Sequence, residues 1–134
     1  MSGPLRIARL AALTSEGADP NTFTGHARMT RMPGLSEAPA VKAFRVEFEA
    51  AARTHWHTHS GPQLLVVLDG RCRLQCEGEP VREIAAGDVA CIAAGERHWH
   101  GAAAGGPMTH LAVNIESTTT WLEAVTDAEY AAGA

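Results

Sequence analysis

Hydrophobic and polar residues alternate along much of this chain, which is the pattern of β-strands that bury one face. Between positions 41 and 49, Phe44, Val46 and Phe48 alternate with polar or small residues. Successive side chains of a strand point to opposite faces of a sheet, so this stretch is predicted to bury its aromatic side. The same reasoning predicts strands at 21–32, 53–59, 63–68, 71–76, 81–84, 89–92 and 109–115, and one that begins at 98.

Turn residues separate these segments at short intervals. Asp69 and Gly70 form a strong hairpin signal, and residues 33–40, P-G-L-S-E-A-P-A, are predicted to form a loop. Many short strands joined by turns predict an all-β sandwich or barrel with antiparallel strands. Residues 1–20 fit a short helix or a strand equally well, so they are left unassigned.

The C-terminal part departs from the strand pattern. Residues 117–125, S-T-T-T-W-L-E-A-V, are predicted to form one or two helical turns, with Trp121, Leu122 and Val125 as their apolar face. A capping box at 126–129 predicts a further turn. We expect the apolar face to pack against the outside of the barrel or against a neighbouring subunit, which would suit a homodimer or a homotetramer.

The composition is that of one globular domain. The chain has 134 residues, 46% of them hydrophobic and 19% charged, and no apolar run approaches the ~20 residues of a membrane span. We therefore expect a soluble protein with no membrane partner. The net charge is −4 and the basic residues are scattered, which argues against nucleic acid because phosphate recognition needs clustered Lys and Arg. Small molecules are the expected partners.

The termini and the cysteines bear on the compartment. Residues 1–13 interleave charged with apolar residues, so they lack the continuous apolar core of a signal peptide. Cys72, Cys76 and Cys91 are odd in number and form no C-x-x-C pair. No disulfide framework is predicted, and a reducing, cytoplasmic location is expected.

Two clusters of histidines occur within this strand pattern. His55, His57 and His59 alternate with other residues, so in one continuous strand the three imidazoles would share a face. A second H-W-H run contains His98 and His100. Two such clusters in one small domain suggest a single metal site, and the competing interpretation is a row of solvent-facing histidines.

Four side chains could converge on one ion. His57 and His59 share a face, Gln63 begins the next strand after a Gly-Pro turn, and His98 would approach from a different strand. Three imidazole nitrogens and one amide oxygen suit iron, manganese, nickel, cobalt or zinc. One divalent transition metal ion per subunit is therefore predicted.

The spacing of these residues resembles the two motifs of the cupin family, G-x5-H-x-H-x3-E-x6-G and G-x5-P-x-G-x2-H-x3-N. The matching residues are Ala51, His57, His59, Gln63, Gly70, Gly87, Ala93, Gly95, His98 and Ala102. The resemblance implies a double-stranded β-helix, or jelly-roll barrel, over about residues 22–116 of a single domain 1–134, with a helical segment at 117–130. It also implies His57, His59, Gln63 and His98 as the metal ligands.

Gln63 stands where this family has a glutamate. A carboxylate would neutralise one unit of the charge of a divalent ion, whereas an amide leaves the full 2+ in place. Such an ion is a stronger Lewis acid, which holds anions and disfavours high-valent redox states. This favours lyase chemistry over a dioxygenase.

Further stretches resemble a narrower group, the bacterial cupin hydroxynitrile lyases. They are W-H-T-H at 56–59, G-E-R-H-W-H-G-A at 95–102, M-T-H-L-A at 108–112 and W-L-E-A-V-T-D-A-E-Y at 121–130. The resemblance covers about residues 22–130. It implies a manganese or iron site that cleaves cyanohydrins to an aldehyde and cyanide; an Fe(II) dioxygenase and a non-catalytic binding barrel are the alternatives.

Roles can then be assigned around the predicted ligands. His110 is the first candidate for a general base on a substrate hydroxyl, the alternative being a core histidine bonded to the backbone. His100 shares the parity of His98 and would act as a second acid or base, or would position a ligand. The predicted substrate-binding residues are Phe44, Val46, Phe48, His55 and Asn114, the first three as apolar walls.

Overall fold

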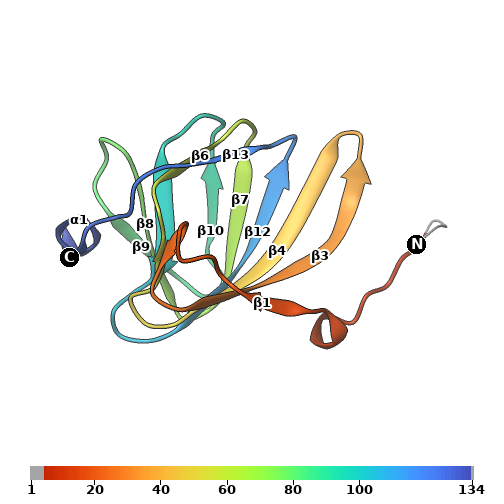
Figure 1. Cartoon of the computed structure of the whole chain (residues 1–134), viewed down its shortest axis with the longest axis horizontal. Coiled ribbons are helices and arrows are strands. Elements are labelled where there is room, and N and C mark those ends of the chain that lie inside the picture. Colours follow the sequence, from red (N-terminus) through yellow and green to blue (C-terminus); the bar gives the residue numbers. More distant parts are fainter. Residues whose placement is uncertain (1–4, 134) are drawn as a thin grey trace.

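The computed structural model describes residues 5–133, and two antiparallel sheets form a barrel (Figure 1). The six-stranded sheet has the order β1 (Ser15–Gly17), β3 (Ala27–Glu37), β4 (Ala40–Phe48), β12 (Met108–Ile115), β7 (Gln63–Asp69), β10 (Val89–Ile92). The seven-stranded sheet has the order β13 (Thr119–Trp121), β6 (His57–His59), β11 (His98–Ala102), β5 (Arg53–Thr54), β2 (Phe23–Thr24), and β8 (Arg71–Cys76) joins β11 to β9 (Arg82–Ala85).

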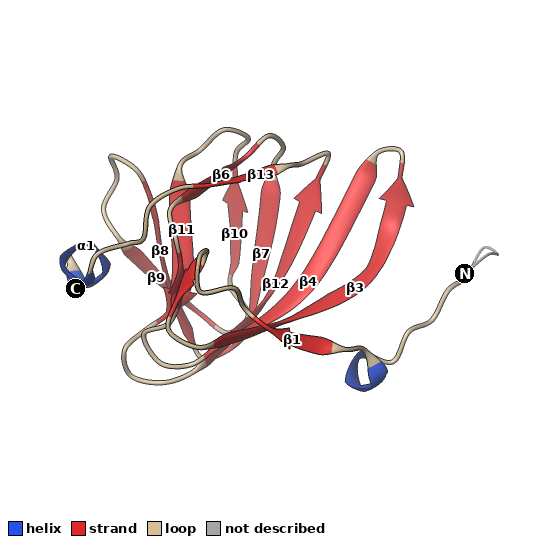
Figure 2. Ribbon diagram, in the orientation of Figure 1, coloured by secondary structure: helices blue, strands red, loops and turns tan. Residues whose placement is uncertain are grey.

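Strands dominate the chain, as Figure 2 shows, with a 3-10 turn at Leu10–Ala12 and one α-helix, α1 (Asp127–Ala131). The jelly-roll barrel with a short C-terminal helix that the sequence predicted is therefore confirmed. Within the part of the chain that the structure describes, neither helix has the length and apolar character that crossing a bilayer would require.

The core lies between the two sheets and follows the predicted alternation. Val46 and Phe48 point inward from β4, while Glu47 is exposed. These side chains pack with Val67 and Met108 of the same sheet and with Cys72 and Ala102 of the opposite sheet. Burial of this apolar surface is the main driving force that holds the sheets together.

The predicted loop at 33–40 is wrong, because β3 continues through it to Glu37. The pairing of β3 with β4 shifts register between Met32 and Ser36. Pro33 has no N–H group to donate, and at this irregularity the ladder does not require one from it. Proline is tolerated in strands at such bulges and at edges. The Pro and Gly residues that indicated a loop instead mark a distorted strand.

The predicted helical turns at 117–125 are also wrong. Residues Thr119–Trp121 form β13, which pairs antiparallel with β6 so that Thr119 faces His59 and Trp121 faces His57. Threonine and tryptophan favour strands, and the edge of β6 provides unpaired backbone groups. Val125 is buried and Leu122 packs against the same cluster with Trp56 and Trp99, so these side chains pack on the barrel, one of the two predicted alternatives, although not as a helix face. The predicted capping box is confirmed, with Thr126 as the N-cap residue of α1.

The histidine strand predicted at 53–59 is interrupted. The backbone N–H groups of His55 and Trp56 donate to Thr22 and Glu123 in other segments, which separates β5 from β6. Trp56 is buried against Trp99, Val125 and Tyr130, away from the barrel interior. The three imidazoles of the stretch therefore do not share one continuous face.

Two buried arginines attach the C-terminal segment to the outside of the seven-stranded sheet. Arg53 donates to the carbonyl of Val125, and Arg73 donates to the carbonyls of Tyr130 and Ala132. The Tyr130 hydroxyl donates to the carbonyl of Ala102 at 2.6 Å, and the Arg53 guanidinium carbon lies 4.6 Å from the centroid of the Tyr130 ring. Both arginines pair with Gly101 of β11, so this attachment supports the strand that carries His98.

This attachment predicts unequal effects for two arginines that bind the same carboxylate. Glu83 accepts from Arg71 and Arg73, whose side chains are 61% and 6% exposed. Arg73→Met leaves buried carbonyls without donors and should lower the free energy of unfolding by about 3 kcal/mol. Arg71→Met should cost less than about 1 kcal/mol, because its ion pair is solvent-exposed. Urea unfolding measures both, and equal costs would contradict the role of Arg73.

Candidate metal centre and active site

Four side chains from three strands converge inside the barrel. His57 and His59 extend from β6, Gln63 begins β7, and His98 begins β11, and all four are buried. The His57 ring centroid lies 4.2 Å from that of His98 and 4.9 Å from that of His59. The Gln63 Oε1 atom lies 3.2 Å from His98 Nε2. The structure therefore brings together the four residues that the sequence predicts as ligands.

A tight turn places Gln63 beside the histidines. A Cβ atom added to Gly61 would lie 1.9 Å from the carbonyl oxygen of Ile115, so no residue with a side chain fits at this position. The turn thus allows the chain to pass close to the end of β12 before β7 begins. This close approach is the reason that Gln63 faces the imidazoles of β6.

Each of the three histidines is held through its Nδ1 atom. His57 Nδ1 lies 2.9 Å from the carbonyl oxygen of His55, and His98 Nδ1 lies 2.8 Å from that of Glu96. Carbonyl oxygens only accept, so both rings donate from Nδ1 and keep a lone pair on Nε2. His59 Nδ1 lies 2.9 Å from the hydroxyl oxygen of Thr119. This is how proteins orient histidines that bind metal ions.

The unpartnered atoms of the cluster test whether an ion fits. Gln63 donates from Nε2 to Asn114 Oδ1 at 2.9 Å, and its Oε1 atom lies on the side of His98. Two acceptors, Oε1 and the Nε2 lone pair of His98, then face each other, which is unfavourable unless a cation lies between them. His59 Nε2 is buried and finds no hydrogen-bond partner in residues 5–133. Three nitrogens and one oxygen with free lone pairs fit a divalent transition metal ion.

Burial keeps these imidazoles neutral. Desolvation, followed by the nearby His98 ring, lowers the pKa of His57 to about 2 and that of His59 to about 4. Desolvation also lowers the pKa of His98. Neutral imidazole is the form that binds a metal ion, so no proton has to be released on binding at neutral pH.

A second histidine pair lies next to the ligands. His110 on β12 and His100 on β11 are both buried, and His110 Nε2 lies 3.0 Å from His100 Nδ1. Desolvation lowers the pKa of His110 to about 4 and that of His100 well below its usual value. His100, and not the predicted ligand His59, forms with His57 and His98 a group whose ring nitrogens lie within 4.8 Å of one another. The pair therefore adjoins the same ion site.

A cavity of about 400 Å³ opens over this cluster. Its wall includes the side chains of His57, His59, Gln63, His100 and His110. The rest of the wall has an apolar part and a polar part: Phe23, Met29, Phe44, Val46, Ala112 and Trp121 in the first, Lys42, Thr54, Asn114, Ser117, Thr118 and Thr119 in the second. Lys42 is charged and no carboxylate occurs among these lining residues, all of which are described, so the cavity suits a neutral or anionic ligand.

The predicted substrate-binding residues differ in position. Phe44, Val46 and Asn114 line the cavity. Phe48 lies behind the second histidine pair, with its ring centroid 5.2 Å from that of His110. His55 is absent from the lining and contributes its backbone carbonyl to His57 instead of its side chain.

Sequence reasoning missed two residues of the site. Thr119 anchors His59, and Trp121 lies over His57 with ring centroids 4.6 Å apart. Both were assigned to a helix. Their strand propensity was the available signal, but the pairing of β13 with β6 joins positions about sixty residues apart and is not visible in local periodicity.

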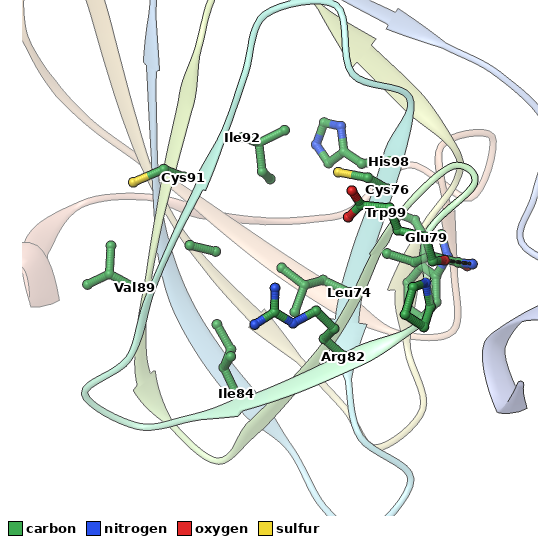
Figure 3. Close-up of a pocket in the computed structure, with 13 residues that line it drawn as sticks. Leu74, Cys76, Glu79, Arg82, Ile84, Val89, Cys91, Ile92, His98 and Trp99 are labelled. Atoms are coloured by element: carbon green, nitrogen blue, oxygen red, sulfur yellow. Dashed lines mark hydrogen bonds between the residues drawn. The ribbon is translucent and has the colours of Figure 1, made fainter. Parts of the chain in front are cut away.

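A second cavity, of about 270 Å³, lies between β8, β9 and β10 (Figure 3). Its wall is largely apolar and includes Leu74, Ile84 and Ile92. His98 lines it, whereas the other site histidines do not. The first cavity therefore contains the other three predicted ligands and the second histidine pair.

A buried group of imidazoles and one carboxamide inside a small jelly-roll barrel is the arrangement to which the sequence motifs pointed. The sequence model of the Cupin domain matches residues 44–114. The chain belongs to the cupin family.

Three individual proteins show how similar this chain is to known sequences and structures. The chain is 39% identical over 129 residues to (R)-mandelonitrile lyase from Granulicella tundricola, and the alignment covers 94% of this chain and 98% of that protein. The predicted resemblance to the cupin hydroxynitrile lyases is thereby confirmed. A crystal structure of a cupin-like protein from Thermotoga maritima is 33% identical, with a TM-score of 0.81 over 85% of this chain and 89% of that chain. A predicted oxalate decarboxylase from Thermotoga maritima, 24% identical with a TM-score of 0.71 over 82% of this chain and 98% of that chain, shows the fold alone.

The anchored Nδ1 atoms predict different consequences for neighbouring histidines. His57→Ala and His98→Ala each remove an oriented lone pair and should weaken Co²⁺ or Mn²⁺ binding by at least about 100-fold. His55→Ala is the matched control: its backbone carbonyl remains, so affinity should stay within about 3-fold of the wild-type value. Competition with a chelating dye measures the affinities. A loss in His55→Ala equal to that in His57→Ala would contradict this ligand set.

Proposed function

We propose that this protein is a metal-dependent lyase that cleaves a cyanohydrin to an aldehyde and hydrogen cyanide, and that catalyses the reverse addition. The observation that carries the proposal is its 39% identity, over nearly the full length of both chains, to (R)-mandelonitrile lyase. A neutral histidine pair that lines one cavity together with His57, His59 and Gln63 supports it.

His57, His59, Gln63 and His98 would hold the ion, with manganese or iron favoured and zinc, nickel or cobalt as alternatives. When bound, the ion would supply a Lewis acid that polarises the substrate and stabilises the negative charge that develops on oxygen or cyanide. All four side chains are neutral, so the chain itself does not reduce the charge of the ion. This property favours polar bond cleavage over redox chemistry.

The His100 and His110 pair provides the proton transfer. One proton lies between His110 Nε2 and His100 Nδ1, and His110 Nδ1 and His100 Nε2 are buried without partners in the described part of the chain. The neutral pair can accept the hydroxyl proton of a cyanohydrin as its C–CN bond breaks. The electrons of that bond leave with cyanide, the hydroxyl carbon becomes the aldehyde carbonyl, and the pair returns the proton to give hydrogen cyanide.

The apolar part of the cavity suits the organic substituent of such a substrate. Phe44, Val46 and Trp121 lie in the same wall, and a cavity of about 400 Å³ is within the range of ligand sites for small molecules. Aromatic contact with Phe44 or Trp121 would exclude water from the carbonyl product. An aromatic or branched aliphatic cyanohydrin is therefore the substrate class that we expect.

The proposal predicts turnover of mandelonitrile and its dependence on His110. The protein loaded with Mn²⁺ or Fe²⁺ should release benzaldehyde, followed by ultraviolet absorbance, with an equal amount of cyanide. His110→Ala should lower kcat by at least about 100-fold, the usual contribution of a general acid or base, while the metal content stays unchanged.

His26→Ala is the control, because His26 is exposed, and it should leave kcat unchanged. Unchanged kinetics in His110→Ala would refute its role as the base. If mandelonitrile and aliphatic cyanohydrins all remain intact while oxygen is consumed with Fe²⁺ present, the alternative function, a cupin dioxygenase, is supported instead. If the protein shows no cyanohydrin turnover and no oxygen uptake, the remaining alternative, a non-catalytic binding barrel, is supported.

A further inference from the structure

Asn114 makes a contact that the catalytic proposal does not use. It lies on β12 directly across from Gln63 on β7, and the two are partners in the ladder between these strands. Gln63 Nε2 donates to Asn114 Oδ1 at 2.9 Å. The side chain of Asn114 thus contacts a predicted ligand as well as lining the cavity.

A carboxamide, unlike a carboxylate, has two different ends. The end of Gln63 that faces His98 must be Oε1 for the residue to bind a cation. His98 donates from Nδ1 to the carbonyl of Glu96, so its Nε2 atom, 3.2 Å from Gln63, is an acceptor. Without another constraint, Gln63 would turn its NH₂ group toward His98 and form a hydrogen bond. That bond would occupy His98 Nε2 and would point Gln63 Oε1 away from the ion site.

The Asn114 Oδ1 atom opposes this rotation because it accepts from the NH₂ group on the far side of Gln63. Rotating Gln63 with Asn114 in place would set Gln63 Oε1 against Asn114 Oδ1, two acceptors in contact, and would leave the half-buried Asn114 Oδ1 without a donor, which is costly. Two cross-strand neighbours therefore determine which atom of Gln63 faces the imidazoles. A glutamate at position 63 would not need such a constraint, since both carboxylate oxygens can bind a cation.

We propose that Asn114 is a positioning residue that holds the Gln63 carboxamide in its metal-binding orientation. Glutamine at position 63 and the acceptor at position 114 then function as one unit. This inference rests on the metal centre of the proposed function and is independent of the substrate.

A double-mutant cycle at positions 63 and 114 tests the inference through metal affinity. Asn114→Leu removes the acceptor and should weaken Co²⁺ and Mn²⁺ binding by about 10- to 100-fold. In a Gln63→Glu background the same substitution should change affinity by less than about 3-fold, because a carboxylate has no wrong orientation. Competition with a chelating dye gives the affinities. The visible absorption of bound Co²⁺ at saturation should change when Asn114→Leu is made in the wild-type protein, and should stay constant when it is made in Gln63→Glu.

Two further variants separate positioning from folding. Asn114→Asp keeps an acceptor for the Gln63 NH₂ group and should bind Co²⁺ at least as tightly as the wild type. Val113→Ala, on the opposite face of β12, should leave affinity unchanged. Circular dichroism and urea unfolding identify any variant whose loss of metal affinity reflects misfolding. If Asn114→Leu misfolds, the affinity of Asn114→Asp relative to the wild type tests the positioning role instead.

Three results with the variants would overturn the inference. They are wild-type affinity in Asn114→Leu, an equal loss in both backgrounds, and an affinity in Asn114→Asp as low as in a folded Asn114→Leu. A cyanohydrin assay that fails while the coupling is intact would refute the lyase proposal and leave this inference standing. A wild-type protein that binds neither Co²⁺ nor Mn²⁺ would overturn both.

Discussion

Burial of uncharged imidazoles between two sheets is the constraint on which the rest of the structure depends. His57 and His98 each donate to the carbonyl of the residue two positions earlier, so the backbone next to their own strands sets the ring orientation. Burial lowers their pKa values, which keeps the lone pairs available. Among the predicted ligands, His59 Nε2 is buried without a partner in residues 5–133, which is costly. A bound metal ion would offset this cost by using that lone pair.

The C-terminal segment serves both the site and the fold. Before residue 122 it forms β13, which brings Thr119 to His59 and Trp121 over His57 on the cavity side. From residue 125 on it lies on the outside of the same sheet, where Arg53 and Arg73 bind its carbonyls. Both arginines flank β11, the strand of His98 and His100. One short segment therefore contacts β6 on the cavity side and β11 on the outside, and its attachment should limit their movement.

The replacement of a carboxylate by an amide has two consequences. It would leave the charge of a bound ion undiminished, which would favour polar over redox chemistry. It also makes orientation matter, because one end of the amide donates and the other accepts. Asn114, the partner of Gln63 across the β12–β7 ladder, accepts from the NH₂ end of Gln63 and so would fix this orientation. A change at position 63 is thus expected to alter the role of position 114, and neither residue can be interpreted alone.

The sequence by itself determined the barrel, the four converging ligand candidates and the second histidine pair. Strand periodicity and motif spacing are local properties, and they place His57, His59, Gln63 and His98 on strands with defined faces. Tertiary structure decided what local patterns cannot show: that residues 33–37 are a distorted strand, that Thr119 and Trp121 belong to β13, and that His55 contributes a carbonyl instead of its ring. For the first two, backbone partners distant in sequence override local preference, because backbone groups removed from water must be paired wherever the fold brings them together. For His55, backbone bonds from its own segment to Thr22 and Glu123 end β5 and turn its ring away from the ligand face.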